Sequence, residues 1–151
     1  MKQKIKIIII DDENLAREIT KNYLSSKKEL EIIAECSNGF EAIKKINELN
    51  PDMILLDIQM PKLNGFEVLE LLEELPVIIF TTAYDNYAIK AFEVNAADYL
   101  LKPFSEERFN EALGKAFTHL ADKEKQKAII KNLIEHNDDE RDFLERVVIK
   151  K

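Results

Sequence analysis

Short apolar runs recur along the chain, and each is followed by a segment with helical spacing. The clearest run is Met53 to Leu56, which is continuous rather than alternating and therefore predicts a strand buried on both faces. Asp57 ends this run, and the Pro-Lys-Leu-Asn-Gly segment at 61–65 breaks the strand. Further strands are predicted at 5–10, 30–36, 77–80 and 96–101. The 30–36 run alternates more than the others, which favours a place at or near the sheet edge.

Apolar residues at helical spacing predict a helix after each strand. The five apolar faces contain Leu15, Ile19 and Tyr23; Ala42, Ile46 and Leu49; Phe66, Leu69, Leu72 and Leu75; Tyr87, Ala91 and Phe92; and Phe109, Leu113 and Leu120. Asn14 and Ser105 are the expected N-caps of the first and last of these helices. Five strand–helix alternations with short connections predict an α/β fold, a doubly wound five-stranded parallel sheet with helices on both faces and right-handed crossovers. These elements fill one domain, residues 1–120.

The chain changes character after Leu120. Residues 121–142 are rich in Lys, Glu, Asp and Asn, and no Gly or Pro follows Gly114, so the last helix is expected to continue past the domain as a linker. A seven-residue apolar repeat runs through it, but Lys123 and Lys127 occupy core positions, which favours a solvated helix over a coiled coil. Residues 143–151 predict the opening strand of a further, truncated domain.

Composition narrows the class of protein. Of 151 residues, 46% are apolar and 34% charged, as in an ordinary globular domain, and the net charge of −7 argues against nucleic-acid binding by this part of the protein. Cys36 has no partner for an internal disulfide and is expected to be a small core residue. The apolar run at 7–10 is too short for a signal peptide, and no run approaches the ~20 residues of a membrane helix, so a cytoplasmic protein without membrane contact is expected.

Polar side chains collect where four of the predicted strands end. If these strands pair in parallel, Asp11, Asp12, Asp57, Thr82 and Lys102 meet at one edge of the sheet. Three carboxylates repel one another and need a cation, for which oxygen ligands favour Mg²⁺ or Mn²⁺. The ammonium and the hydroxyl suit phosphoryl oxygens, and an Asp can accept a phosphoryl group. Each residue alone has a structural explanation, as a helix cap, a strand end or a surface charge, but their joint occurrence favours a phosphoryl-transfer site.

These residues lie in motifs that resemble the receiver domains of bacterial two-component response regulators, CheY-like domains of flavodoxin-like fold with strand order 2-1-3-4-5. The matching segments are Asp11-Asp12-Glu13, Leu56-Asp57-Ile58-Gln59-Met60-Pro61, Asn64-Gly65, Thr82-Ala83 and Tyr99-Leu100-Leu101-Lys102-Pro103-Phe104. The resemblance implies a phosphorylation-controlled switch rather than an enzyme. Its partner is a sensor histidine kinase, which transfers a phosphoryl group to the domain from a phosphohistidine.

The resemblance also implies a role for each acidic residue. Asp57 is the expected phosphoacceptor, and Asp12, Asp57 and the backbone carbonyl of Gln59 are expected to ligate Mg²⁺, with Asp11 acting mainly through water. In this family the residues two positions after the acceptor and two after the switch hydroxyl tune dephosphorylation. Here they are Gln59 and Tyr84.

Other positions of the motif imply the switch. Thr82 and Lys102 are expected to contact the phosphoryl group, and Lys102–Pro103 is expected to be a cis peptide, which X-Pro bonds permit. Phosphorylation would draw the Thr82 hydroxyl inward, and Tyr99 would rotate into the vacated space. This change reshapes the face made by the fourth helix, fifth strand and fifth helix, where partners dock and a homodimer can form.

A narrower resemblance concerns the output. Residues 81–104 look like receivers that precede a LytTR-type DNA-binding domain, and residues 143–151 look like the opening strand of that domain. DNA would then be contacted only through a C-terminal part missing from this chain. A stand-alone receiver, or one without a DNA-binding output, is the alternative.

Two other classes remain possible from the residues alone. Haloacid dehalogenase-type phosphatases also use an Asp nucleophile with Mg²⁺, but they have a second Asp two residues later, where this chain has Gln59. A flavodoxin-like flavin or nucleotide binder needs a phosphate-cradling loop after the first strand. The acidic segment at 11–13 repels phosphate unless a cation intervenes.

Overall fold

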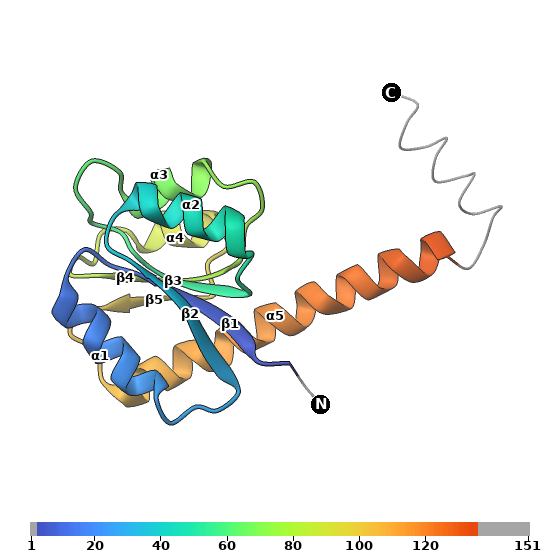
Figure 1. Cartoon of the computed structure of the whole chain (residues 1–151), viewed down its shortest axis with the longest axis horizontal. Coiled ribbons are helices and arrows are strands. Elements are labelled where there is room, and N and C mark those ends of the chain that lie inside the picture. The colour runs from blue at the N-terminus through green and yellow to red at the C-terminus, as the bar shows by residue number, and fades with distance from the viewer. Residues whose placement is uncertain (1–2, 136–151) are drawn as a thin grey trace. The chain divides into compact units, whose positions relative to one another are not determined.

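A computed structural model describes residues 3–135 of the chain. The chain divides into two compact units, Met1–Phe117 and Thr118–Lys151. The first unit contains a five-stranded sheet with the order β2-β1-β3-β4-β5, in which every neighbouring pair is parallel. The strands are β1 (Ile5–Ile10), β2 (Leu30–Cys36), β3 (Met53–Asp57), β4 (Val77–Thr82) and β5 (Asp98–Leu101). The doubly wound sheet and the edge position of the 30–36 strand are therefore confirmed (Figure 1).

The central strands form the core because both of their faces are covered. Every residue of β3 and β4 is buried, as are the last four residues of β1. A strand covered on both sides cannot alternate, which explains why these segments read as continuous apolar runs. Cys36, at the end of β2, is buried at 1% exposure, and its expected place in the core is confirmed.

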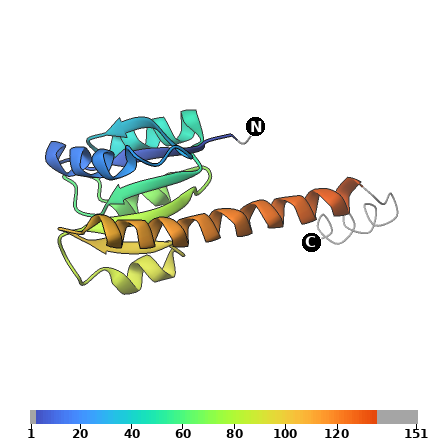
Figure 2. The same ribbon diagram turned by 90° about the horizontal axis from the view of Figure 1, so that it is seen from below.

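Helices cover both faces of the sheet. They are α1 (Asn14–Leu24), α2 (Gly39–Leu49), α3 (Gly65–Glu70), α4 (Ala88–Glu93) and α5 (Glu106–Glu135). Figure 1 shows α2, α3 and α4 on one face and α1 with the first turns of α5 on the other; Figure 2 gives the same arrangement from below. The Tyr23 ring of α1 packs on Phe109 of α5, with ring centroids 5.7 Å apart. This contact closes the second face.

Local side-chain bonds begin most of these helices. Asn64 and Glu67 form a reciprocal capping box at α3, and Ser105 Oγ accepts the Arg108 N–H at 3.1 Å at the start of α5. The predicted Ser105 cap is confirmed. The predicted Asn14 cap is wrong, because Asn14 is already the first helical residue and its side-chain oxygen accepts a bond from Arg17.

Three further expectations about the elements need correction. The fifth strand begins at Asp98 rather than at residue 96. Helix α3 has only 6 residues, so Leu72 and Leu75 lie beyond it; the Leu71 and Leu72 N–H groups bond carbonyls three residues back, which tightens and ends the helix. Phe92 of α4 is 84% exposed rather than part of the core face.

Helix α5 runs from Glu106 to Glu135, and its sequence has no Gly or Pro after Gly114. Within the first unit it buries Phe109, Ala112, Leu113 and Ala116. In the second unit, described by itself, the residues from 118 to 135 are exposed or partly exposed, and none of them is buried. The end of the predicted linker and the strand predicted at 143–151 lie outside the described residues. Among residues 3–135, no helix combines the length and apolar character needed to cross a membrane.

Candidate phosphoryl-transfer site

The carboxyl ends of four neighbouring strands bring the predicted site residues together. Asp11 follows β1 directly, Asp57 ends β3, Thr82 ends β4 and Lys102 follows β5. Parallel pairing aligns these ends, because Asp57 lies beside Thr81 and Thr82 beside Leu101 in the strand register. The site therefore follows from the topology of the sheet.

Three carboxylates form one cluster at this edge. One oxygen from each of Asp11, Asp12 and Asp57 lies within 4.8 Å of the others. Asp11 and Asp57 are buried at 4% and 3% exposure, whereas Asp12 is exposed. Three hard oxygen donors, one of them open to solvent, fit a divalent cation such as Mg²⁺ that keeps part of its water shell.

Lys102 places its ammonium against this cluster. Its Nζ lies 2.7 Å from Asp11 Oδ2, 3.7 Å from Asp57 Oδ1 and 3.5 Å from Glu13 Oε1. Burial alone would lower the pKa of Lys102, but the bond to Asp11 and the nearby carboxylates outweigh it and raise the pKa above its usual value. Lys102 is therefore a permanent positive charge beside the Asp57 carboxylate.

Burial of the Asp57 carboxylate raises its pKa to about 8. The negative charge of Asp11 adds to the rise, while Lys102 opposes it. Without a divalent ion, the single ammonium does not compensate three carboxylates. The cluster of carboxylates therefore favours either protonation of Asp57 or binding of a cation beside it.

The backbone around Asp57 is held tightly. The Ile58 N–H donates to the Thr81 carbonyl at 3.0 Å, and the Gly65 N–H donates to the Ile58 carbonyl at 2.9 Å. A Cβ at Gly65 would lie 2.7 Å from the Asp57 carbonyl oxygen, so only glycine permits this close approach. The Asn-Gly segment after β3 therefore packs against the backbone of Asp57 and holds it in place.

The hydroxyls of the two predicted switch residues, Thr82 and Tyr99, both bond the loop after β4. Thr82 is fully buried, and its hydroxyl accepts the Tyr84 N–H at 3.2 Å. The Tyr99 hydroxyl donates to the Tyr84 carbonyl and accepts the Tyr87 N–H at 3.3 Å. Tyr84 itself is 53% exposed. Both hydroxyls thus bond the same short loop between β4 and α4.

Gln59 connects two loops at the rim of the site. Its side-chain Nε2 donates to the Tyr87 hydroxyl, and the Tyr87 ring packs on Phe66 with centroids 6.0 Å apart. The loop after β3 is thereby joined to the start of α4. The sequence predicts only that Tyr87 lies on the face of a helix. It does not predict the bond to Gln59, because nothing in the spacing of the two residues indicates that they meet.

The peptide bond Lys102–Pro103 is cis. Beside it a cavity of about 420 Å³ opens between α1 and the end of β5. Its lining includes Asp11, Leu15, Ile19 and Lys102. The acid cluster is therefore reachable from outside through an opening that is largely apolar on the α1 side.

Comparison with known proteins agrees with this geometry. Residues 7–114 match the family described as the response regulator receiver domain. The chain is 46% identical over 134 residues to an uncharacterized response regulatory protein of Yersinia pestis, covering 87% of this chain and 56% of that protein. It is 49% identical over 113 residues to the transcriptional regulatory protein BtsR of Escherichia coli K12, covering 74% of this chain and 47% of BtsR. The chain thus spans about half the length of these curated relatives.

Solved structures give the same result. The response regulatory domain of mrkE from Klebsiella pneumoniae superposes with a TM-score of 0.70 at 32% identity, covering 78% of this chain and 98% of that one. The REC domain of AraT from Geobacillus stearothermophilus superposes with a TM-score of 0.70 at 29% identity, covering 79% and 97%. The parallel sheet, the acid cluster and these matches lead to one conclusion: the chain belongs to the receiver domain family of two-component response regulators.

Proposed function

We propose that Asp57 accepts a phosphoryl group from the phosphohistidine of a partner sensor histidine kinase and thereby switches the domain. The observation that carries the proposal is the buried Asp57 carboxylate, 3.7 Å from the Lys102 ammonium and clustered with Asp11 and Asp12. The cavity beside Lys102 supports access by a phosphohistidine side chain. This phosphoryl transfer is proposed to take place in the cytoplasm, the location expected from the sequence.

The same carboxylates are proposed to hold Mg²⁺ or Mn²⁺. Asp12, Asp57 and the Gln59 backbone carbonyl would be direct ligands, with Asp11 acting mainly through water. The all-oxygen donor set and the raised pKa of Asp57 support this assignment. When bound, the ion neutralises charge on the carboxylates and on the transferring phosphoryl oxygens.

The residues of the chain have distinct parts in the proposed transfer. A carboxylate oxygen of Asp57 forms a new P–O bond while the P–N bond of the phosphohistidine breaks and its electron pair stays on the imidazole nitrogen. Lys102 pairs with a phosphoryl oxygen, as its charge at this position allows. Thr82 donates its hydroxyl to another oxygen. The product is an acyl phosphate on Asp57.

The proposed switch uses the loop after β4. In the structure the Thr82 hydroxyl accepts the Tyr84 N–H and the Tyr99 hydroxyl donates to the Tyr84 carbonyl. If Thr82 turns toward a phosphoryl oxygen, the first bond breaks and the loop is released, so Tyr99 can change position. Phosphorylation shifts this equilibrium only by its differential affinity for the two arrangements.

The face of α4, β5 and α5 is the proposed docking surface for a homodimer. Ile89, Phe92 and Leu101 are 77%, 84% and 45% exposed there, so this face presents large apolar side chains to solvent, as interaction sites often do. Movement of Tyr99 in β5 would alter this face directly. This surface is the proposed route from the phosphorylated site to a partner.

The proposed output is transcriptional, through a LytTR-type DNA-binding domain that follows this chain in the whole protein. The resemblance of residues 81–104 to receivers of that type supports it, as does the similarity to the transcriptional regulatory protein BtsR, of which the chain covers 47%. DNA is contacted only by that further part. With a net charge of −7, the present chain is unsuited to binding the phosphate backbone of DNA.

Incubation with Mg²⁺ and acetyl phosphate tests the proposal. A receiver gains one phosphoryl group, visible in the intact mass and removed by hydroxylamine, which cleaves acyl phosphates. A phosphatase of the haloacid dehalogenase type would instead consume the acetyl phosphate with many turnovers. A flavin binder would do neither, and either of these results would refute the assignment.

Tyr84 and Gln59 are proposed to tune the lifetime of the phosphoryl group. The exposed Tyr84 side chain follows the switch hydroxyl by two residues and is proposed to screen the acyl phosphate from water. The Tyr84→Ala variant is therefore expected to lose its phosphoryl group several-fold faster, measured from the decay of the phosphorylated mass. Tyr84→Phe, which keeps the ring, is the control. Equal decay of the alanine variant and the wild type would exclude the screening role.

A further inference from the structure

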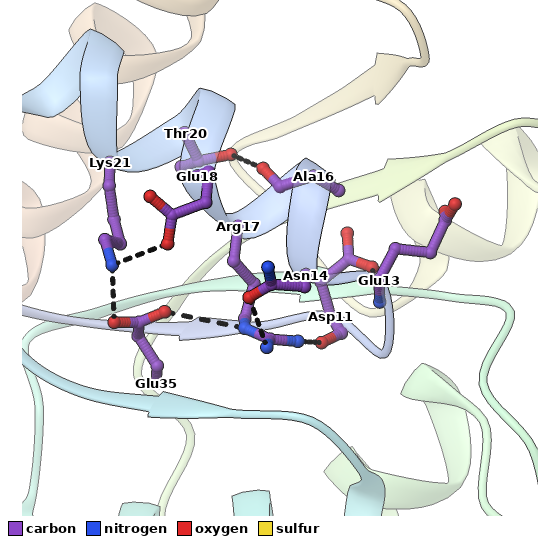
Figure 3. A network of polar contacts seen from close by, with 9 residues as sticks. All are labelled: Asp11, Glu13, Asn14, Ala16, Arg17, Glu18, Thr20, Lys21 and Glu35. Carbon is purple, nitrogen blue, oxygen red and sulfur yellow. Dashed lines mark hydrogen bonds and ion pairs between the residues drawn. The ribbon is translucent and has the colours of Figure 1, made fainter.

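Arg17, on the first turns of α1, lies against the loop that carries the acidic pair. Its side chain is only 15% exposed. The guanidinium Nη1 donates to the backbone carbonyl of Asp11 at 2.6 Å, and Nη2 donates to Asn14 Oδ1 at 3.1 Å (Figure 3). The short first bond goes to the main chain of a cluster residue rather than to its carboxylate. Arg17 therefore holds the position of the loop and leaves the acidic oxygens free for other partners.

Glu35 of β2 holds Arg17 from the other side. Its Oε1 lies 3.5 Å from Arg17 Nε, and its Oε2 lies 3.1 Å from the Lys21 ammonium (Figure 3). The backbone reinforces this connection, because the Asp11 N–H donates to the Cys36 carbonyl at 3.0 Å. The acidic loop is thus tied to the end of β2 by the main chain and, through Arg17, by Glu35.

The contacts of Asp11 leave it little freedom. Arg17 binds its carbonyl, the Glu13 N–H donates to Oδ1 at 3.0 Å and Lys102 pairs with Oδ2 at 2.7 Å. Two of these partners belong to the loop or to the site itself. Arg17 is the partner contributed by α1, and through Glu35 it connects the loop to a strand outside the cluster.

We propose that Arg17, held by Glu35, is a positioning residue that pre-orders the 11–13 loop and thereby strengthens divalent-cation binding at the acid cluster. The proposal rests on the function proposed above. Gathering three carboxylates costs free energy because they repel one another. A loop already fixed by Arg17 does not have to be ordered when the cation binds, and supporting residues of this kind typically change metal affinity 10–100-fold.

The positioning role and a simple charge effect predict opposite changes in metal affinity when Arg17 is removed. Arg17 is a cation near a cation site, so Coulomb repulsion alone would make its removal tighten metal binding. Positioning makes its removal weaken binding. The Arg17→Lys substitution distinguishes the positioning effect from the charge effect. Lysine keeps the positive charge but lacks the planar guanidinium that bonds the Asp11 carbonyl and Glu35 at the same time.

The test measures Mn²⁺ affinity from the electron paramagnetic resonance signal of the free ion. Arg17→Gln and Arg17→Lys are both expected to bind Mn²⁺ about 10-fold more weakly than the wild type. Lys21→Gln is the matched control. Lys21 bonds the same Glu35, and Glu18, but no atom of the 11–13 loop, so its variant is expected to keep wild-type affinity.

A double-mutant cycle tests whether Glu35 acts through Arg17. Glu35→Gln is expected to weaken Mn²⁺ binding in the wild type and to have no further effect in the Arg17→Gln background. Equal effects in both backgrounds would assign Glu35 a long-range charge role and overturn its part in the proposal. The far-UV circular dichroism of each variant verifies folding, and Arg17→Lys carries the test if Arg17→Gln is unfolded.

Two results would overturn the role of Arg17. Tighter Mn²⁺ binding by Arg17→Gln would show that its charge dominates, and wild-type affinity of Arg17→Lys would show that the fork is not needed. Failure of the proposed function looks different. In that case the wild-type protein itself binds no Mn²⁺, which would overturn both proposals together.

Discussion

The Asp57→Asn variant is expected to take up no phosphoryl group from acetyl phosphate in the presence of Mg²⁺. Asparagine has nearly the shape of aspartate, so it fits the buried position at the end of β3, where 3% of the residue is exposed. Its neutral amide is not a nucleophile of comparable strength and cannot form the acyl phosphate. Intact mass spectrometry after a timed incubation measures the loss, which should be complete.

Asp52→Asn provides the matched control for this prediction. Asp52 immediately precedes β3 and therefore lies at the opposite end of the same strand, where its carboxylate accepts the Lys6 N–H at 2.8 Å. The same chemical change there leaves the acid cluster intact, so uptake should stay at the wild-type level. If the Asp57→Asn protein were labelled to the same stoichiometry as wild type, the phosphoryl group would reside on another residue.

The strands of this domain could be predicted because each signal is local. The runs in β1, β3 and β4 are apolar on both faces, and that pattern is typical of strands that are covered on both sides. The approximate place of the acid cluster follows from the same signal, since parallel strands end at one edge. Topology therefore brings Asp57 and Lys102 together, although 44 residues separate them along the chain.

The details that the sequence did not predict depend on contacts between elements. Arg17 reaches the Asp11 carbonyl and Glu35 only because the fold brings the start of α1 close to the ends of β1 and β2. Apolar periodicity indicates that α1 packs on the sheet but not which polar groups meet at its start. The bond from Gln59 to Tyr87 depends in the same way on how α4 lies against the loop after β3.

Helix ends were also poorly predicted, for a different reason. Asn14 has the composition of an N-cap, but its side chain serves Arg17, and the helix begins one residue earlier than a cap at this position would imply. The Asn14 side chain thus bonds Arg17 within the same helix instead of capping the first turn, and Arg17 in turn contacts the Asp11 carbonyl and Glu35. The polar residues of the acidic loop are arranged around the cluster rather than around the helix end.

The Asp57→Asn variant should also be more stable than the wild type in the absence of divalent ions, increasingly so at higher pH. Burial, and next the charge of Asp11, raise the folded-state pKa of Asp57 to about 8, against about 3.9 in the unfolded chain. A group whose pKa is higher in the folded state stabilises folding fully below its unfolded pKa. That contribution is lost as the pH rises through the folded value. For Asp57 the loss runs from about pH 4 to about pH 8.

The size of the effect follows from the two pKa values. Between pH 5 and pH 9 the difference in unfolding free energy between Asp57→Asn and wild type should grow by at most about 4 kcal/mol, because asparagine does not ionise and solvent screening reduces the effect of the shift. Urea unfolding followed by circular dichroism in EDTA measures it, and the difference between the two proteins cancels the titration of residues that both share. Saturating Mg²⁺ should reverse much of the trend by stabilising the ionised wild-type cluster and binding the variant less well.

A difference in stability that stayed constant from pH 5 to pH 9 would contradict this account. It would mean that Lys102, 3.7 Å from Asp57 Oδ1, already compensates the ionised carboxylate. The cluster would then need no further positive charge, and the argument for a divalent ion would lose its electrostatic basis. The measurement thus probes the demand for a cation directly, without relying on phosphorylation, and it connects the burial of one carboxylate to the chemistry proposed for the site.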